Sequence, residues 1–175
     1  MGDILMKYDM SIFLYVNRQF RCNILDLTLP KLTHLGGATF TLSLLAFIIF
    51  FTNLSNRFSA ITALISLTLS HLIVHFIKIK FCRKRPYDST PNAQLLSAPL
   101  HDFSFPSGHT TAAFSVAVIF SLHVPILSFI LLPLASIVAV SRVYLGLHFP
   151  SDCIVGAFIG TITSLSLYQL LVSFI

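Results

Sequence analysis

The chain has 175 residues, of which 55% are hydrophobic and only 10% are charged, and its formal net charge is +5. The mean hydropathy is +0.87. Because water-soluble domains carry about 25% charged residues, this composition excludes an ordinary soluble protein and indicates a membrane protein. The length allows one domain, residues 1–175. The positive charge suits anionic lipid headgroups or an anionic substrate.

The N-terminal segment is predicted to lie at the membrane interface. Residues 4–20 are amphipathic and carry Lys7, Asp9 and Arg18. This makes the segment too polar to span a bilayer and typical of an interfacial helix. Residues 24–34 are predicted to form a second short helix, which ends at the two glycines that follow.

Five apolar stretches come next, each close to the length that a bilayer requires. A hydrocarbon core of about 30 Å takes about 20 helical residues, and about 17 are tolerated. The predicted spans are residues 38–54, 58–78, 107–122, 126–147 and 152–174. The polar residues 79–105 form the long loop between the second and third spans. The predicted fold is an all-α, polytopic membrane helix bundle with about five transmembrane helices and an N-terminal interfacial helical segment.

Side chains that could carry chemistry are concentrated in three short blocks. They are Lys78 with Arg85-Pro86, then Pro106-Ser107-Gly108-His109, then Ser141-Arg142 with His148 and Asp152. The polar turns near residues 55 and 124 lie at one face of the membrane. Counting the spans from these turns therefore places all three blocks together at the opposite face.

The first block has two interpretations. Read as a juxtamembrane basic cluster, the block would mark the cytoplasmic side or bind anionic lipid. The cluster consists of Lys78, Lys80, Arg83, Lys84 and Arg85. Lys78, however, ends a span, and His71 and His75 precede it on the same helix face. Because ionisable groups within a span usually face the bundle interior or a polar cavity, Lys78 and Arg85 are candidates for anion binding. The two histidines either pack against neighbouring helices or support the site.

The second block is predicted to begin a helix. Ser107 is a plausible N-cap, and Gly108 lets the backbone approach a ligand closely. The free N–H groups of a helix start form a ready anion site. An ordinary capped helix would explain Ser107 and Gly108 but not His109, which falls in the first turn at the membrane face.

The third block combines a cation with a histidine and a carboxylate. Arg142 near the end of a span is costly to insert without an anionic partner. His148 and Asp152 are four residues apart, so one turn of helix would bring them together. The carboxylate would then fix the imidazole tautomer and make the other ring nitrogen a better nucleophile or base. A snorkelling arginine with a chance His–Asp pair is the alternative, which the other two blocks disfavour.

In order and spacing, the three blocks resemble the type 2 phosphatidic acid phosphatase family, which also includes the vanadium-dependent haloperoxidases. The match covers residues 78–152 and departs at no motif position. The resemblance implies that His148 attacks phosphorus and forms a phosphohistidine, and that Asp152 orients His148. It implies that His109 protonates the leaving oxygen and then activates water.

The resemblance also implies a phosphate cradle that needs no cofactor and no metal. Lys78, Arg85 and Arg142 would clamp the phosphoryl oxygens. Ser107 and the backbone N–H of Gly108 would complete the cradle. The sequence fits a metal-independent enzyme, since it shows no carboxylate cluster of the kind that holds a metal ion.

A site at the membrane face favours a phosphorylated membrane lipid as substrate, with the lipid bilayer as environment and no nucleic acid as partner. The short chain with its five spans is similar to bacterial undecaprenyl-diphosphate phosphatases of the family. Phosphatidylglycerophosphate, phosphatidate and lipid A phosphatases share the motifs and are alternatives. A more remote alternative is a non-catalytic protein that binds or transports anionic lipids. Residues 87–104 are expected to cover the site, and the sequence indicates no oligomeric state.

Two indications of orientation disagree. Ten of the eleven Lys and Arg residues fall on the site side, with only Arg57 on the other. The positive-inside rule would then place the site in the cytoplasm. Bacterial family members usually place it on the outer side, and three of the ten cations are assigned to the site itself. The resemblance therefore leads us to expect a multi-pass cell-membrane protein with an extracytoplasmic site.

Overall fold

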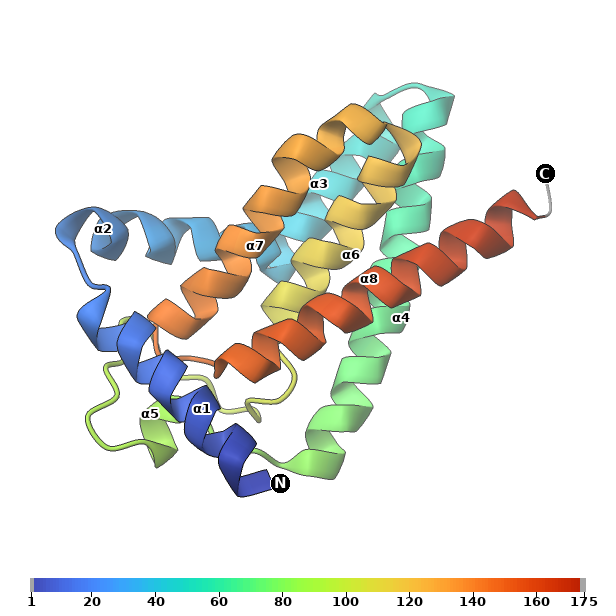
Figure 1. Ribbon diagram of the computed structural model, residues 1–175. Coiled ribbons are helices and arrows are strands. Elements are labelled where there is room, and N and C mark those ends of the chain that lie inside the picture. Colours follow the sequence, from blue (N-terminus) through green and yellow to red (C-terminus); the bar gives the residue numbers. More distant parts are fainter. Residues whose placement is uncertain (1, 174–175) are drawn as a thin grey trace.

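The computed structural model describes residues 2–173, which form helices joined by turns and one long loop (Figure 1). The elements are α1 (Gly2–Leu14), the π-helical turn η1 (Tyr15–Gln19), α2 (Asn23–Leu32), the 3₁₀ turn η2 (Thr33–Gly36), α3 (Ala38–Phe51), α4 (Leu54–Phe81), α5 (Pro86–Ser89), α6 (Gly108–His123), the 3₁₀ turn η3 (Pro125–Leu127), α7 (Ser128–Tyr144) and α8 (Pro150–Val172). The described part of the chain contains no strand, so the all-α prediction is confirmed.

Three segments are long and apolar enough to cross a bilayer: the segment that contains α4, then η3 with α7, and α8. The segment from α2 through η2 passes the same test together with α3, as a pair bent by 54°, which gives up to four spans. Helix α6 has 16 residues, slightly fewer than the roughly 17 that spanning requires. The prediction of a membrane helix bundle is confirmed, whereas the number of five spans is not.

Helix α6 lies in the middle of the bundle, packed against α3, α4, α7 and α8 (Figure 1). Most of its residues are small, and those on several sides of the helix are buried, including Thr110, Ala112, Ser115 and Ile119. A helix enclosed in this way needs no polar face. Its position lets its N-terminal end reach the ends of three other helices.

Helices α6 and α8 approach closely because α8 presents small residues at every fourth position, Gly156, Gly160 and Ser164. An added Cβ at Gly156 would lie 2.7 Å from the carbonyl oxygen of Ser107, and one at Gly160 would lie 2.5 Å from that of Thr111. The buried hydroxyl of Ser164 donates to a backbone carbonyl of α6 at 3.0 Å. Small residues at this spacing let helix backbones meet in a membrane. The contact holds the start of α6 against the start of α8.

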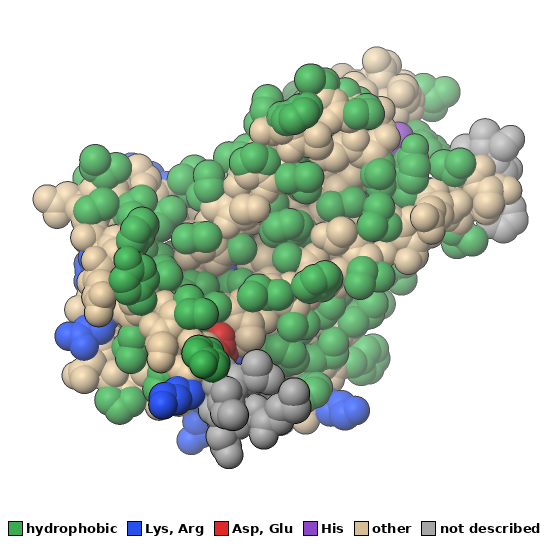
Figure 2. All heavy atoms as spheres, viewed as in Figure 1, with side chains coloured by type: hydrophobic (Ala, Val, Ile, Leu, Met, Phe, Trp, Pro, Cys, Tyr) green, Lys and Arg blue, Asp and Glu red, His purple; other side chains and the backbone are tan. Residues whose placement is uncertain are grey.

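The outer surface of the bundle is apolar (Figure 2). Phe50, Phe76, Phe129 and Phe158 are each more than 60% exposed. Soluble proteins rarely expose large continuous apolar areas, so this surface suits contact with lipid. Lys and Arg side chains gather instead along the lower and left-hand edge of the face shown in Figure 2.

Helix α1 lies across one end of the bundle, beside the start of α8 (Figure 1). Phe13 is fully buried and packs edge-to-face against Phe149, with ring centroids 5.5 Å apart. In η1, the side-chain amide of Asn17 donates to the carbonyl oxygens of Gln94 and Tyr144. The prediction of two N-terminal helices is confirmed, and the first of them is docked on the bundle by buried contacts.

Three predicted boundaries require correction. Helix α4 begins at Leu54, with Asn53 as its N-cap, so most of the predicted polar turn is helical. The predicted loop 79–105 loses its first residues to α4 and contains the short helix α5. Helix α8 starts at Pro150 because proline suits the first helical position; residue 174 of the predicted fifth span lies outside the described residues.

Candidate active site

The three blocks meet at one end of the bundle, where α4 ends, α6 begins, α7 ends and α8 begins (Figure 1). Hydrogen bonds join them directly. The guanidinium of Arg85 lies 3.2 Å from Nε2 of His148, and the backbone N–H of Ser107 donates to the carbonyl of Asp152 at 3.0 Å. The predicted convergence of the blocks is confirmed.

A tight turn between α7 and α8 presents His148. Gly146 has φ +83°, and an added Cβ there would collide with the carbonyl of Gln94, so glycine is required. The backbone N–H groups of Leu147 and His148 both donate to the carbonyl of Arg142, at 3.1 and 3.2 Å. The chain therefore folds back on the end of α7, and His148 is buried there.

The partner of His148 differs from the prediction. His148 precedes α8 and does not share a helical turn with Asp152. Its Nδ1 lies 2.7 Å from the carbonyl oxygen of Ser104 and 3.6 Å from the nearer carboxylate oxygen of Asp152. Because a carbonyl can only accept, Nδ1 carries the proton and Nε2 is left with the lone pair. The backbone of Ser104 thus fixes the tautomer that the carboxylate was expected to fix.

Asp152 is fully buried, and its carboxylate accepts hydrogen bonds from three donors. One oxygen accepts from the backbone N–H of Phe149 at 2.8 Å and from the hydroxyl of Ser104. The other accepts from the guanidinium of Arg83 at 2.6 Å. Asp152 therefore caps the start of α8 and holds Ser104, and through Ser104 it contributes to the placement of His148.

Lys78 and Arg85 both bind the carboxylate of Asp102. Nζ of Lys78 and Nη2 of Arg85 each lie 2.6 Å from one of its oxygens. Burial would raise the pKa of this carboxyl group, but the hydrogen bond and charge of Lys78, with those of Arg85, lower its pKa to about 2. Arg85 is buried and also donates to the carbonyl of Leu147 at 2.7 Å. The carboxylate of Asp102 is thus already bound to Lys78 and Arg85, two of the three residues predicted to clamp the phosphoryl group.

Arg142, the third cation, has donors that nothing in the described part of the chain accepts. It is 3% exposed. One terminal nitrogen donates to the hydroxyl of Thr33 at 3.2 Å, but Nε and Nη2 are buried without a hydrogen-bond partner. Buried, unpaired donors of a charged group are costly. The charge of Arg142 also lowers the pKa of His148, so the two groups are close, and free donors of this kind suit an anionic ligand.

The start of α6 supplies the remaining predicted residues. Ser107 is the N-cap as predicted, and its hydroxyl oxygen accepts from the hydroxyl of Thr110 at 3.0 Å. The first N–H groups of a helix have no acceptor within it, which leaves those of Gly108 and His109 for a ligand. His109 lies close to η2, since a Cβ at Gly37 would be 3.6 Å from its Nε2. His71 lies beside this helix start as well, with its Nε2 3.8 Å from where a Cβ of Gly108 would be.

Burial makes His148 a neutral side chain. Desolvation, aided by the charges of Arg142 and Arg85 and opposed by Asp152, lowers its pKa to about 3. With Nδ1 protonated and bound to Ser104, the unprotonated Nε2 can act as a nucleophile at physiological pH. Nε2 faces Arg85, one of the cations that would hold the group under attack.

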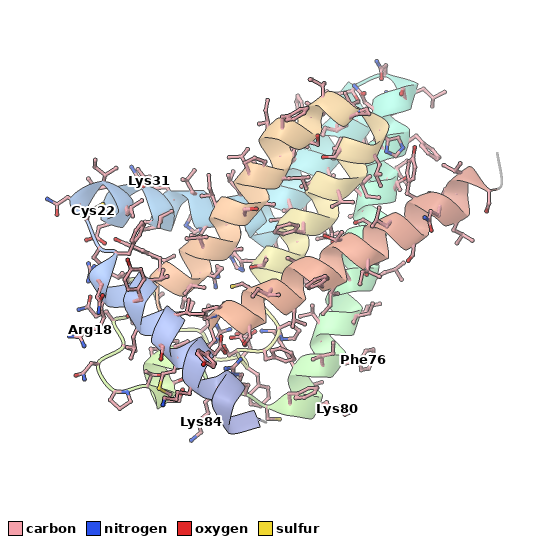
Figure 3. All side chains as sticks on the ribbon, viewed as in Figure 1. Arg18, Cys22, Lys31, Phe76, Lys80 and Lys84 are labelled. Carbon is pink, nitrogen blue, oxygen red and sulfur yellow. The ribbon has the colours of Figure 1, made fainter. Side chains whose placement is uncertain are left out.

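Sequence reasoning missed several residues of the site. Asp102 and Ser104 lie in the loop that was expected only to cover it, Thr33 lies in η2, and Arg83 was grouped with the basic cluster. Nothing in the local sequence distinguishes Arg83 from its exposed neighbours Lys80 and Lys84, which point away from the bundle (Figure 3). Its position two residues before Arg85 is the one available signal.

Comparison with known proteins identifies the class. Residues 59–174 match the family described as the PAP2 superfamily, and the chain belongs to this family. The resemblance inferred from the three motifs is thereby confirmed.

Relatives within this class carry different names. The chain is 29% identical over 113 residues to the bacitracin transport permease protein BcrC of Bacillus licheniformis. This match covers 65% of the chain and 56% of the relative. It is also 33% identical over 102 residues to an undecaprenyl-diphosphatase of Sulfolobus acidocaldarius. This match covers 58% of the chain and 50% of the relative. The matches thus span about half the length of these relatives.

A solved structure shares the fold over most of both chains. It is the first transmembrane PAP2 type phosphatidylglycerolphosphate phosphatase from Bacillus subtilis, with a TM-score of 0.79 and 26% identity. The likeness covers 95% of this chain and 86% of that one. The bundle described above is therefore the fold of a transmembrane PAP2 protein.

Proposed function

We propose that the protein is an integral-membrane lipid phosphatase that works through a phosphohistidine. The observation that carries the proposal is Arg142, whose buried guanidinium has two unpartnered nitrogens and whose charge lies close enough to His148 to lower the pKa of the imidazole. Three cations, a neutral imidazole and a helix start gathered in one buried place suit a phosphoryl group and its transition state. The names of the relatives support a phosphate ester or diphosphate as substrate.

In the first step, Nε2 of His148 attacks the terminal phosphorus. A P–N bond forms, the P–O bond to the lipid breaks, and the leaving oxygen takes a proton from the protonated form of His109, which becomes neutral. Lys78, Arg85 and Arg142 bind the three phosphoryl oxygens as charge develops on them. Ser107 and the free N–H groups at the start of α6 complete the cradle.

In the second step, water attacks the phosphohistidine. His109, now neutral, takes a proton from the water, and the P–N bond breaks to release inorganic phosphate and free His148. The carbonyl of Ser104 keeps the proton on Nδ1 throughout, since that bond does not depend on the substrate. Before the first step, the phosphoryl group must replace Asp102 on Lys78 and Arg85.

Undecaprenyl diphosphate is the proposed substrate, converted to undecaprenyl phosphate. The name of the Sulfolobus relative supports it, as does the position of the site at the end of a lipid-facing bundle. The phosphatidylglycerolphosphate phosphatase of the same fold supports phosphatidylglycerophosphate as the second candidate. Phosphatidate and lipid A remain alternatives in the comparison below.

The reaction is proposed to need no metal ion. The three nitrogen cations can neutralise the phosphoryl oxygens that a metal would otherwise bind. Within residues 2–173, no three His, Cys, Asp or Glu side chains are grouped in a way that could hold a metal ion.

Phosphate release in detergent with EDTA tests the proposal. Undecaprenyl diphosphate, phosphatidylglycerophosphate, phosphatidate and lipid A are compared, with wild type and His148→Ala. Metal-independent release that disappears in the variant is expected, and the preferred lipid identifies the substrate. Binding of these lipids without release, equal in both proteins, would instead favour a lipid-binding or transport protein.

The site is proposed to face the extracytoplasmic side. Cys82 is exposed at the site end of α4, whereas Cys153 is buried. In a Cys22→Ser variant, a membrane-impermeant maleimide is expected to label Cys82 in right-side-out vesicles. Labelling only in inverted vesicles would place the site in the cytoplasm, as the distribution of basic residues favours.

A further inference from the structure

We propose that Arg83 and Asp9 are positioning residues for the nucleophile, and that helix α1 therefore belongs to the catalytic assembly. The inference rests on the proposed phosphatase function. The sequence predicted α1 as an interfacial helix and Arg83 as part of a basic cluster, and it assigned neither of them a role in the site.

Arg83 lies between two buried carboxylates. One terminal nitrogen lies 2.6 Å from Oδ1 of Asp152, and the other lies 2.6 Å from Oδ2 of Asp9. Its guanidinium also stacks over the ring of Phe149, 4.2 Å from the centroid. Asp152 and Asp9 are 0% and 8% exposed. Only a planar fork can bind two carboxylates and an aromatic face at once, so lysine would not substitute fully.

The backbone of Arg83 acts on the same group. Its carbonyl accepts from the N–H of Ser104 at 2.9 Å. Ser104 in turn binds Nδ1 of His148 through its carbonyl and Asp152 through its hydroxyl. Arg83, Ser104 and Asp152 thus form a closed ring of hydrogen bonds, and His148 is attached to this ring through the carbonyl of Ser104. Arg83 therefore holds both Ser104, which binds the imidazole, and Asp152, which holds Ser104.

Asp9 carries this arrangement into α1. Besides Arg83, it accepts from the backbone N–H of Ser151 at 2.9 Å and from the Ser151 hydroxyl. Arg83 donates to the same hydroxyl at 2.8 Å. Asp9 therefore binds a free N–H at the start of α8, one residue before Asp152, where a carboxylate is favourable. Phe13, one turn further along α1, packs on Phe149 and supports the same junction.

The arrangement predicts an effect on the chemical step. Arg83 has all its observed side-chain contacts with Asp9, Ser151, Asp152 and Phe149, and none with Lys78, Arg85 or Arg142, the proposed phosphate ligands. Losing it should move Asp152 and His148 while leaving phosphate binding intact. Displacements of about 1 Å at a reacting group cost about 100-fold in rate.

The test measures kcat, KM and inhibition by inorganic phosphate on the lipid that wild type hydrolyses best. Arg83→Gln is expected to lower kcat about 100-fold, with KM and the phosphate inhibition constant changed less than about threefold. Arg83→Lys should recover part of kcat, and Asp9→Asn should lower kcat about tenfold. Because both residues act through one set of contacts, the double variant should be no slower than Arg83→Gln alone.

Matched controls are Lys84→Gln, which removes the adjacent exposed cation, and Asp88→Asn, which removes an exposed carboxylate on α5. Both should leave kcat within about twofold of wild type. If Arg83→Gln does not fold, Arg83→Lys and Asp9→Asn decide the matter. An active wild type with a normal kcat in the Arg83 and Asp9 variants would overturn the inference, as would a loss confined to KM. A wild type that hydrolyses none of the lipids would overturn the proposed function, and this inference with it.

Discussion

The carbonyl oxygen of Ser104 is the hydrogen-bond acceptor for Nδ1 of His148, at 2.7 Å. The carboxylate of Asp152 lies 3.6 Å from the same nitrogen. A peptide carbonyl cannot be protonated at physiological pH, so the tautomer of His148 is fixed by the backbone. The carboxylate stabilises the arrangement mainly by binding the Ser104 hydroxyl, the N–H of Phe149 and Arg83.

Substitution of Ser104 separates these two contributions. Ser104→Ala keeps the carbonyl and removes only the hydroxyl, so kcat is expected to fall less than about tenfold. His148→Gln, which removes the nucleophile, should abolish phosphate release. The loss of kcat in Asp152→Asn should be intermediate between those of the other two variants. It should also be well below the roughly 10⁴-fold loss seen where a carboxylate alone fixes a catalytic histidine. Steady-state rates in detergent measure all three, and a loss in Ser104→Ala as large as that in His148→Gln would contradict the assignment.

Asp102 competes with phosphate for Lys78 and Arg85. Its pKa of about 2 keeps it ionised at every pH at which the enzyme would work. Asp102→Asn is therefore expected to strengthen inhibition by inorganic phosphate, lowering the inhibition constant about tenfold, since partly exposed ion pairs contribute up to about 1 kcal/mol each. Asp88→Asn, on α5, serves as the control. Weaker inhibition in Asp102→Asn would show that the carboxylate positions the cations for phosphate.

The buried, neutral His148 predicts how stability depends on pH. Its pKa is about 3 in the folded protein, against about 6.5 when unfolded. Between these values the unfolded chain binds more protons, so stability falls as pH decreases from about 6.5 towards 3. His148→Gln removes the contribution of this histidine to the pH dependence of stability. The Tm of the variant in detergent should therefore decrease less steeply than that of wild type as the pH falls from about 6.5 to about 4. His101→Gln, in the exposed loop, should follow wild type; identical slopes for all three would refute the prediction.

The sequence sufficed for the parts of the fold and site that depend on local pattern. Hydropathy located α3, α4, α7 and α8, because a bilayer demands long apolar runs. Counting spans placed Lys78, His109 and His148 at one end. The N-cap at Ser107 followed from its position before a helical run.

What the sequence did not predict depends on contacts between distant segments. A serine carbonyl can bind any donor, so nothing marked Ser104 as the partner of His148. Asp9 and Arg83 are 74 residues apart, and each resembles an ordinary surface charge until the fold pairs the two side chains. The predicted number of five spans is not confirmed, since α6, which is enclosed by its neighbours, has 16 residues and is shorter than a lone spanning helix.

The close contact of α6 and α8 sets the distance between the two halves of the site, because Ser107 and His109 start one helix and Asp152 starts the other. A side chain at Gly160 would meet the carbonyl of Thr111 and the backbone of Ser115, at 2.5 and 3.0 Å. Neither backbone can move without shifting α6 relative to α8.

Gly160→Leu is therefore expected to lower Tm and to reduce kcat at temperatures where the variant is still folded. Gly160→Ala should show a smaller loss, since overpacking costs about 1–3 kcal/mol and grows with the volume added. Ser166→Leu, on the exposed face of the same helix, adds comparable volume towards lipid and should change neither quantity appreciably. Thermal unfolding and lipid phosphate release in detergent measure both effects. A Gly160→Leu protein as stable and active as Ser166→Leu would show that the helix contact does not set the geometry of the site.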